Sequence, residues 1–251
     1  MTLPPAARRF SKGDLSAEEL RKIVRSTAKG TFAAASVRKA AERLIAQAEN
    51  DDVASDLIVH DGDLTLPSLD TGMEPFIGLL VVKGDLVVEG LFRDSLDPES
   101  TVIVTGHLRA DRLISSGFLE VHGSVVVERE ALWRDNDGCA EISGDLQAGF
   151  LFTKYHAVKV GGRVIAPLVL GDEARFECEK EYAFVKETDG DHKNALLAVL
   201  PRKALSIAGD PEGGDEDEWW IDYVDDEVLA KLVAQGQPVL QGPWPPKGPR
   251  A

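Results

Sequence analysis

The chain has 251 residues, of which 43% are hydrophobic and 28% are charged, and its formal net charge at pH 7 is −15. This composition is typical of a soluble globular protein with one or two domains. It excludes a membrane-spanning helix, because no apolar run approaches the roughly 20 residues that such a helix needs. The first residues lack the apolar stretch of a secretory signal, and we therefore expect a cytoplasmic protein that does not bind a membrane.

The charge is distributed unevenly along the chain. Residues 1–50 carry a net charge of +5, residues 51–171 carry −11, residues 172–227 carry −12 and residues 228–251 carry +3. An acidic surface repels phosphate backbones, so we expect no nucleic-acid binding. The same surface would attract a basic protein partner, and the alternative is that the charge serves solubility alone.

Residues 1–55 are expected to form an N-terminal arm and a helical cap. Ser16 and Glu19 have the spacing of a capping box, which predicts the start of a helix that Gly30 ends. A second helix should follow to about Asn50, because apolar residues recur there at helical spacing. A solenoid needs a polar-faced cap that keeps its first coil from polymerising by its edge, and we assign this role to the two helices.

Residues 56–171 contain six copies of one pattern, each centred on a glycine. Of the 24 positions two and four places before and after these glycines, all except His60 are apolar. Alternation indicates strands with one buried face, and a repeat of about 20 residues indicates stacked coils. We predict a mainly β fold, a right-handed parallel β-helix of about six coils, with a third short strand at residues 113–114, 151–152 and 168–170. The central glycines are Gly62, Gly84, Gly106, Gly123, Gly144 and Gly162.

Three segments interrupt the regular coils, at residues 67–78, 92–100 and 129–138. Insertions in repeat proteins map to loops, often on one binding face. Trp133 lies in the third segment and is a candidate contact residue; the alternative is that its ring folds back to cover the coil. The sequence of residues 135–138 resembles part of a calcium loop, but the glutamate that such a loop requires is missing, so we expect a plain turn.

Residues 172–251 are expected to form an acidic α+β cap and a tail. A run of four acidic residues stands directly before two tryptophans, and Asp226 is expected to cap a short helix that Gly236 ends. Aromatic anchors with a charged rim are typical of protein-docking patches; the alternative is that the tryptophans pack onto the last coil. The candidate partner-binding residues of the whole chain are Asp215, Glu216, Asp217, Glu218, Trp219, Trp220, Tyr223 and Trp133.

Few residues are candidates for catalysis. Asp63, Asp85 and Asp145 directly follow the glycine in three of the copies and should lie at one corner of the stack. Stacked carboxylates can bind calcium or act as acid and base, but other residue types interrupt this column. The histidines and cysteines have no metal-binding spacing, and the sequence contains no catalytic-serine, phosphate-binding or dinucleotide-binding motif. We therefore assign no catalytic residue, cofactor or metal, and we expect a protein that is not an enzyme.

Residues 80–90 and 102–113 resemble the bactofilins, which are polymer-forming cytoskeletal β-helices of bacteria. The chain is more similar still to bactofilin-like solenoids of bacterial toxin and immunity loci. These share the Gly-Asp-Leu coils and an acidic C-terminal part that ends in a short helix and Gly-x-Pro-Val, here residues 236–239. The resemblance implies a bacterial cytoplasmic protein. Bactofilins polymerise through bare apolar coil ends, whereas both ends of this chain are expected to be covered.

Three functional hypotheses remain open. The first is a non-enzymatic protein-binding β-solenoid, most concretely an immunity protein that neutralises a basic bacterial toxin. The second is a bactofilin-like cytoskeletal or scaffold polymer, which would make the chain a homo-oligomer. The third is a carbohydrate-active enzyme that uses Asp63, Asp85 or Asp145.

Overall fold

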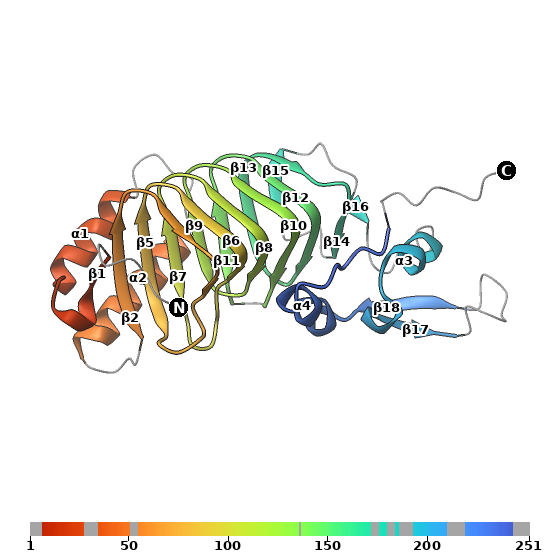
Figure 1. Cartoon of the computed structure of the whole chain (residues 1–251), viewed down its shortest axis with the longest axis horizontal. Helices are drawn as coiled ribbons and strands as arrows, with labels where there is room; N and C mark the ends of the chain where they lie inside the picture. Colours follow the sequence, from red (N-terminus) through yellow and green to blue (C-terminus); the bar gives the residue numbers. More distant parts are fainter. Residues whose placement is uncertain are drawn as a thin grey trace.

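The computed structural model describes residues 7–27, 35–50, 55–135, 137–171, 176–179, 184–185, 193–209 and 219–242. Within these ranges the chain forms a mainly β, parallel β-solenoid of about five turns, close to the six coils expected (Figure 1). Two helices precede the solenoid, and α/β elements follow it. No helix in the described ranges is long and apolar enough to cross a membrane.

The coils build two stacked sheets, here called sheet A and sheet B. Sheet A contains β2 (Asp56–Asp61), β5 (Ile77–Lys83), β7 (Thr101–Val104), β9 (Phe118–Val121), β11 (Cys139–Ile142), β13 (Ala157–Ile165) and β15 (Phe176–Glu179). Sheet B contains β3 (Leu64–Leu66), β4 (Leu69–Asp70), β6 (Leu86–Arg93), β8 (Leu108–Ser115), β10 (Val125–Arg134), β12 (Leu146–Lys154), β14 (Val169–Gly171) and β16 (Phe184–Val185). Neighbouring coils pair in parallel, and β13 spans the corner, since it pairs with β11 in sheet A and with β12 in sheet B.

The interior of the solenoid consists of columns of apolar side chains in register. Residues two places after the central glycines lie opposite one another from coil to coil and are all buried. This column confirms the alignment of the repeats, and it contains Leu64, Leu86, Leu108, Val125, Leu146 and Val164. Because one coil cannot cover its own inner face, the stacking of these columns supplies the core.

The long strands of sheet B bend midway. The pairing register shifts between Val88 and Leu91 in β6 and between Val127 and Ala131 in β10. After the shift the strands pair again, and Leu113 and Leu151 lie in the same interior core as the first halves. The third strands expected at residues 113–114 and 151–152 are therefore the second halves of the bent strands β8 and β12, whereas the one expected at residues 168–170 is the separate strand β14.

The N-terminal helices are α1 (Ala17–Thr27) and α2 (Ala35–Glu49). The capping box is confirmed: the backbone N–H of Glu19 donates to Ser16 Oγ at 3.2 Å, and the backbone N–H of Ser16 donates to Glu19 Oε2 at 2.8 Å. Gly30, expected to end the first helix, lies outside the described residues. The two bonds of the capping box satisfy two of the backbone N–H donors that the start of a helix leaves without partners.

The two helices cover a side of the solenoid. α2 contacts β5, β7, β9 and β11, and the helices share a buried apolar cluster with the outward-facing residues Leu57, Leu79, Val81 and Ile103. The strands of sheet A from β2 to β11 are thus largely buried on both faces, which is typical of parallel strands with continuous apolar sequences. The helices also pack on Leu57 and Val59 of the first coil, and β1 (Arg8–Arg9) adds a contact that the sequence analysis does not predict, because it pairs antiparallel with the edge strand β2.

The polar exception to the repeat, His60, lies at the N-terminal end of the interior. Its side chain is buried, and Nε2 lies 3.0 Å from the backbone oxygen of Asp63. The first coil has no preceding coil to stack on, so its corner backbone needs another partner. The imidazole supplies a partner for this carbonyl oxygen.

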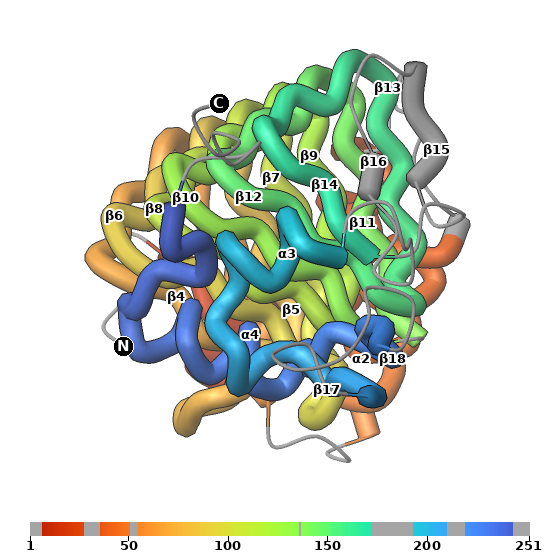
Figure 2. Tube along the Cα trace, turned by 90° about the vertical axis from the view of Figure 1, so that its right-hand side faces the viewer, coloured from red at the N-terminus to blue at the C-terminus, as the bar shows by residue number. Residues whose placement is uncertain are grey.

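The C-terminal elements are α3 (Lys193–Val199), β17 (Leu205–Ala208), β18 (Trp220–Val224) and α4 (Asp226–Ala234). Their apolar residues form a second core with outward-facing Ile114, Leu132, Phe152 and Leu170 of sheet B. Figure 2, which looks at the right-hand side of Figure 1, shows α3 and α4 in front of the stacked coils. The helix cap is one residue earlier than expected: Asp225 accepts a 3.1 Å bond from the Val228 N–H, which leaves the Asp226 carboxylate available for other contacts.

Candidate interaction surface

The corner column that contains Asp63, Asp85 and Asp145 is a structural ladder. Asp63 Oδ1 accepts a 2.8 Å bond from the Asp85 N–H, and Asp85 Oδ1 accepts a 2.7 Å bond from the next corner N–H, that of His107. The following coils have the equivalent bond: His107 Nδ1 accepts from the Ser124 N–H, and Ser124 Oγ accepts from the Asp145 N–H. In the last of these coils Asp145 Oδ1 accepts from the Arg163 N–H at 2.8 Å. The residue types that interrupt the carboxylates are therefore equivalent acceptors. Each carboxylate is occupied by the backbone of its neighbouring coil, which gives no support to an acid–base pair.

The glycines of this corner are required by close stacking. The N–H of Gly106 donates to the backbone oxygen of Gly84 at 2.9 Å, and this contact recurs along the column. A Cβ added to Gly106 would lie 2.7 Å from the carbonyl carbon and oxygen of Gly84. The backbones of adjacent coils therefore leave no room for a side chain at this position.

The structure separates the aromatic candidates into buried and exposed residues. Trp133 lies on β10, in no loop, and its side chain is 0% exposed, so it cannot contact a partner at the surface. Its place is in the solenoid core, where the strand after the register shift turns it inward. Trp219 is also buried, in the core between the C-terminal elements and sheet B. Trp220 and Tyr223 are 54% and 47% exposed, whereas residues 215–218 lie outside the described residues.

Tyr155 adds a third exposed aromatic side chain that the sequence analysis does not identify. It follows β12, has a φ of 64° and is 53% exposed. Lys154 Nζ lies 5.8 Å from the centre of the Tyr155 ring and 5.5 Å from that of Tyr223, within cation–π range of both. Lys154 therefore joins a coil corner to β18. We call these two rings, together with the exposed ring of Trp220 on the same strand β18, the aromatic surface.

A cluster of ion pairs connects the aromatic surface to α4. Lys154 Nζ lies 2.9 Å from Asp226 Oδ1, and Arg134 Nη2 lies 3.2 Å from Asp226 Oδ2. Arg134 also pairs with Glu227, and this hydrogen bond lowers the pKa of the Glu227 carboxyl. Coils and C-terminal elements are thus held together by charge pairs as well as by the apolar core.

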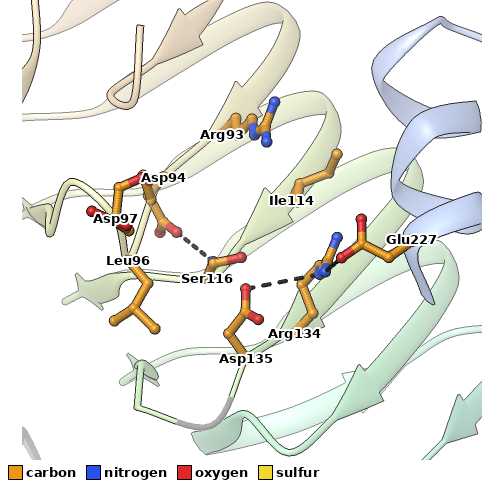
Figure 3. A pocket seen from close by; sticks show the side chains of 10 residues that line it. Arg93, Asp94, Leu96, Asp97, Ile114, Ser116, Arg134, Asp135 and Glu227 are labelled. Carbon is orange, nitrogen blue, oxygen red and sulfur yellow. Dashed lines mark hydrogen bonds and ion pairs between the residues drawn. The ribbon is translucent and has the colours of Figure 1, made fainter.

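Arg134 and Glu227 of this cluster also line a polar pocket of about 340 Å³, which lies between a solenoid corner and α4 (Figure 3). Asp94 contributes to its lining although its side chain is only 1% exposed. Its Oδ1 accepts 2.7 Å bonds from the N–H groups of Ser116 and Gly117, and its Oδ2 accepts a 2.8 Å bond from Ser115 Oγ. Burial raises the pKa of Asp94 to about 6, although the three hydrogen bonds act in the opposite direction.

Two further groups, His156 and Cys139, have pKa values that burial moves far from neutral. Burial lowers the pKa of His156 to about 4, and its Nδ1 lies 3.1 Å from the backbone oxygen of Arg134. Burial also raises the pKa of the Cys139 thiol to about 12, which keeps it protonated. In the described part of the chain no group of three or more His, Cys, Asp or Glu is placed to hold a metal ion.

Comparison with known proteins assigns no family: no family model, no curated protein and no solved structure matches this chain.

Proposed function

We propose that this chain is a non-enzymatic binding protein whose aromatic surface engages a protein partner. The observation that carries the proposal is the exposure of Tyr155, Trp220 and Tyr223 on elements held by the solenoid. Exposed aromatic side chains on a rigid support are typical binding hot spots, because they bury a large area with little loss of conformational entropy. The Trp220 Nε1–H donates to Asp222 Oδ1 at 2.7 Å, so the polar edge of this indole is satisfied while its ring remains available.

The charge supports a basic partner. Residues 172–227 have a net charge of −12, and the acidic run at residues 215–218 directly precedes Trp219 in sequence. A positively charged protein would be attracted over distance and then anchored by the aromatic rings. We propose that this partner is a bacterial toxin and that the chain is its cytoplasmic immunity protein, a distant relative of the bactofilin-like solenoids of toxin and immunity loci. Inhibition would occur by covering a basic active site.

The proposal is tested by affinity capture of partners from native lysate of the source cells. The tagged chain is expected to retain one stoichiometric basic protein, less strongly as salt is raised. Trp220→Ala with Tyr223→Ala should abolish this capture, since loss of one anchor costs about 2 kcal/mol, or roughly 30-fold in affinity. Met73→Ala, which removes an exposed side chain elsewhere, is the matched control. Failure to recover any partner at low salt, or equal recovery by the aromatic double variant, would refute the proposal.

The polymer remains the alternative function, and the structure offers it one obstacle. Stacking of a second solenoid on the first coil requires a free edge at β2, but this edge is paired with β1 at Arg8 and Arg9. Sedimentation of the pure chain distinguishes the two functions. A monomer at micromolar concentration supports the binding protein, whereas filaments would support the bactofilin-like polymer.

A further inference from the structure

Ion pairs connect the pocket beside α4 to the aromatic surface. Asp226 links the two, because it pairs with Lys154 on one side and with Arg134 on the other. Figure 3 shows Asp94 and Asp97 on one side of the pocket, Glu227 from α4 on the other, and Arg134 with Asp135 at the bottom of the view. A volume of about 340 Å³ is at the small end of ligand pockets, which suits one side chain better than an extended ligand.

The ionisable residues of the lining favour a cation. Four carboxylates line the pocket, against two guanidinium groups, Arg93 and Arg134. Arg134 is already paired with Asp226 and Glu227, so its charge is largely compensated within the protein. Asp135, whose side chain is 40% exposed, lies 3.8 Å from Arg134 Nε and so shares this one guanidinium with Asp226 and Glu227. Asp97 is exposed and adds a further carboxylate to the lining.

Asp94 adds a buried negative charge to this lining. Its three hydrogen-bond donors are two backbone N–H groups and a hydroxyl, and none of them carries a formal charge. A carboxylate that is removed from water and bonded only to neutral donors is costly unless an opposite charge approaches it. A cationic group that enters the pocket would supply this charge.

We propose that the pocket receives a single basic side chain, an arginine or a lysine, that projects from the protein partner. The inference rests on the proposed function, since it names the chemistry that one part of the same surface recognises. The aromatic surface then provides the apolar anchors, and the pocket provides a charged contact that selects for a basic residue at one position. Arginine fits best, because its planar donors can bond two carboxylates at once.

The test uses the purified full chain and a short probe, the capped tripeptide Gly-Arg-Gly. The control probe carries citrulline in place of arginine, which keeps the shape of the side chain and removes its charge. Binding is followed by the NMR shifts of the Ser116 and Gly117 amides, whose N–H groups bond to Asp94. The arginine peptide is expected to shift these amides saturably, and the citrulline peptide to leave them unchanged at the same millimolar concentrations.

The variant Asp97→Asn with Asp135→Asn removes two charges and preserves the shape of the pocket. Asparagine tolerates the positive φ of 79° at position 135, so the backbone should not change. This variant should bind the arginine peptide at least about five-fold more weakly, whereas Glu89→Gln, an exposed change on β6, should bind as the parent does.

Equal shifts from both peptides, a lack of shift with the arginine peptide, or unchanged binding by the double variant would each overturn the pocket assignment. The peptide titration tests the pocket independently of the capture experiment. The aromatic residues that the capture experiment replaces do not line the pocket. A failed peptide titration with successful capture would therefore reject the pocket and retain the binding protein.

Discussion

Replacement of Asp94 by asparagine should change how stability depends on pH. Asparagine has the same shape as the protonated carboxyl: its oxygen can accept from the Ser116 and Gly117 N–H groups, and its amide can donate to Ser115 Oγ. The folded protein therefore keeps the two backbone bonds, and the third bond remains with its direction reversed, as it would be with the protonated carboxyl. The substitution removes only the ability of residue 94 to release a proton.

The sign and size of the effect follow from the pKa of Asp94. In the folded protein burial raises this pKa from 3.8 to about 6, so the folded state takes up the proton before the unfolded state as pH falls. The wild-type protein should therefore gain stability, relative to Asp94→Asn, as pH falls from 7.5 to 4. A shift of this size corresponds to about 3 kcal/mol in the free energy of unfolding.

The assay is urea unfolding of both proteins at several pH values between 4 and 7.5. The dependence of the unfolding free energy on urea concentration should be equal in the two proteins, so that their difference reports stability alone. Other titrating groups are shared and cancel in this difference. If the difference stays constant with pH, or if the wild type loses stability relative to the variant as pH falls, the reasoning about the buried carboxylate is wrong.

Three further changes test the interior, each by urea unfolding. Gly106→Ala should destabilise the protein by about 1–3 kcal/mol, because its Cβ would meet the Gly84 backbone, whereas Gly242→Ala has open space and should be neutral; equal effects would refute the close-stacking argument. Leu108→Ala should cost about 2–5 kcal/mol and Ile165→Ala, at an exposed site, much less; a small loss from the first would contradict the interior column. Because burial lowers the pKa of His156 to about 4, the wild type should lose about 3 kcal/mol relative to His156→Asn as pH falls from 6.5 to 4, and a parallel pH profile would refute this.

The interior of the solenoid could be predicted from the sequence because its constraints are local and repeated. Leu86, Leu108 and Leu146 recur at the same offset from a glycine, and only stacked coils place such residues in one column. The capping box of Ser16 and Glu19 is likewise a short-range pattern, so it too was predictable. The corner acceptors were harder to interpret, because Asp85 and His107 share a role that becomes visible only when the coils are stacked.

The surface depended on contacts between distant parts of the chain. The sequence shows that Trp133, Trp219 and Trp220 are aromatic, but only the packing of β10 and of the C-terminal elements buries the first two and exposes the third. Tyr155 and Tyr223 are 68 positions apart in sequence, and they share Lys154 because β18 lies beside a coil corner. Local periodicity therefore determined the coils, whereas the tertiary structure decided which side chains and charges face a partner. The physical reason is that burial of a side chain depends on which distant segment packs over it.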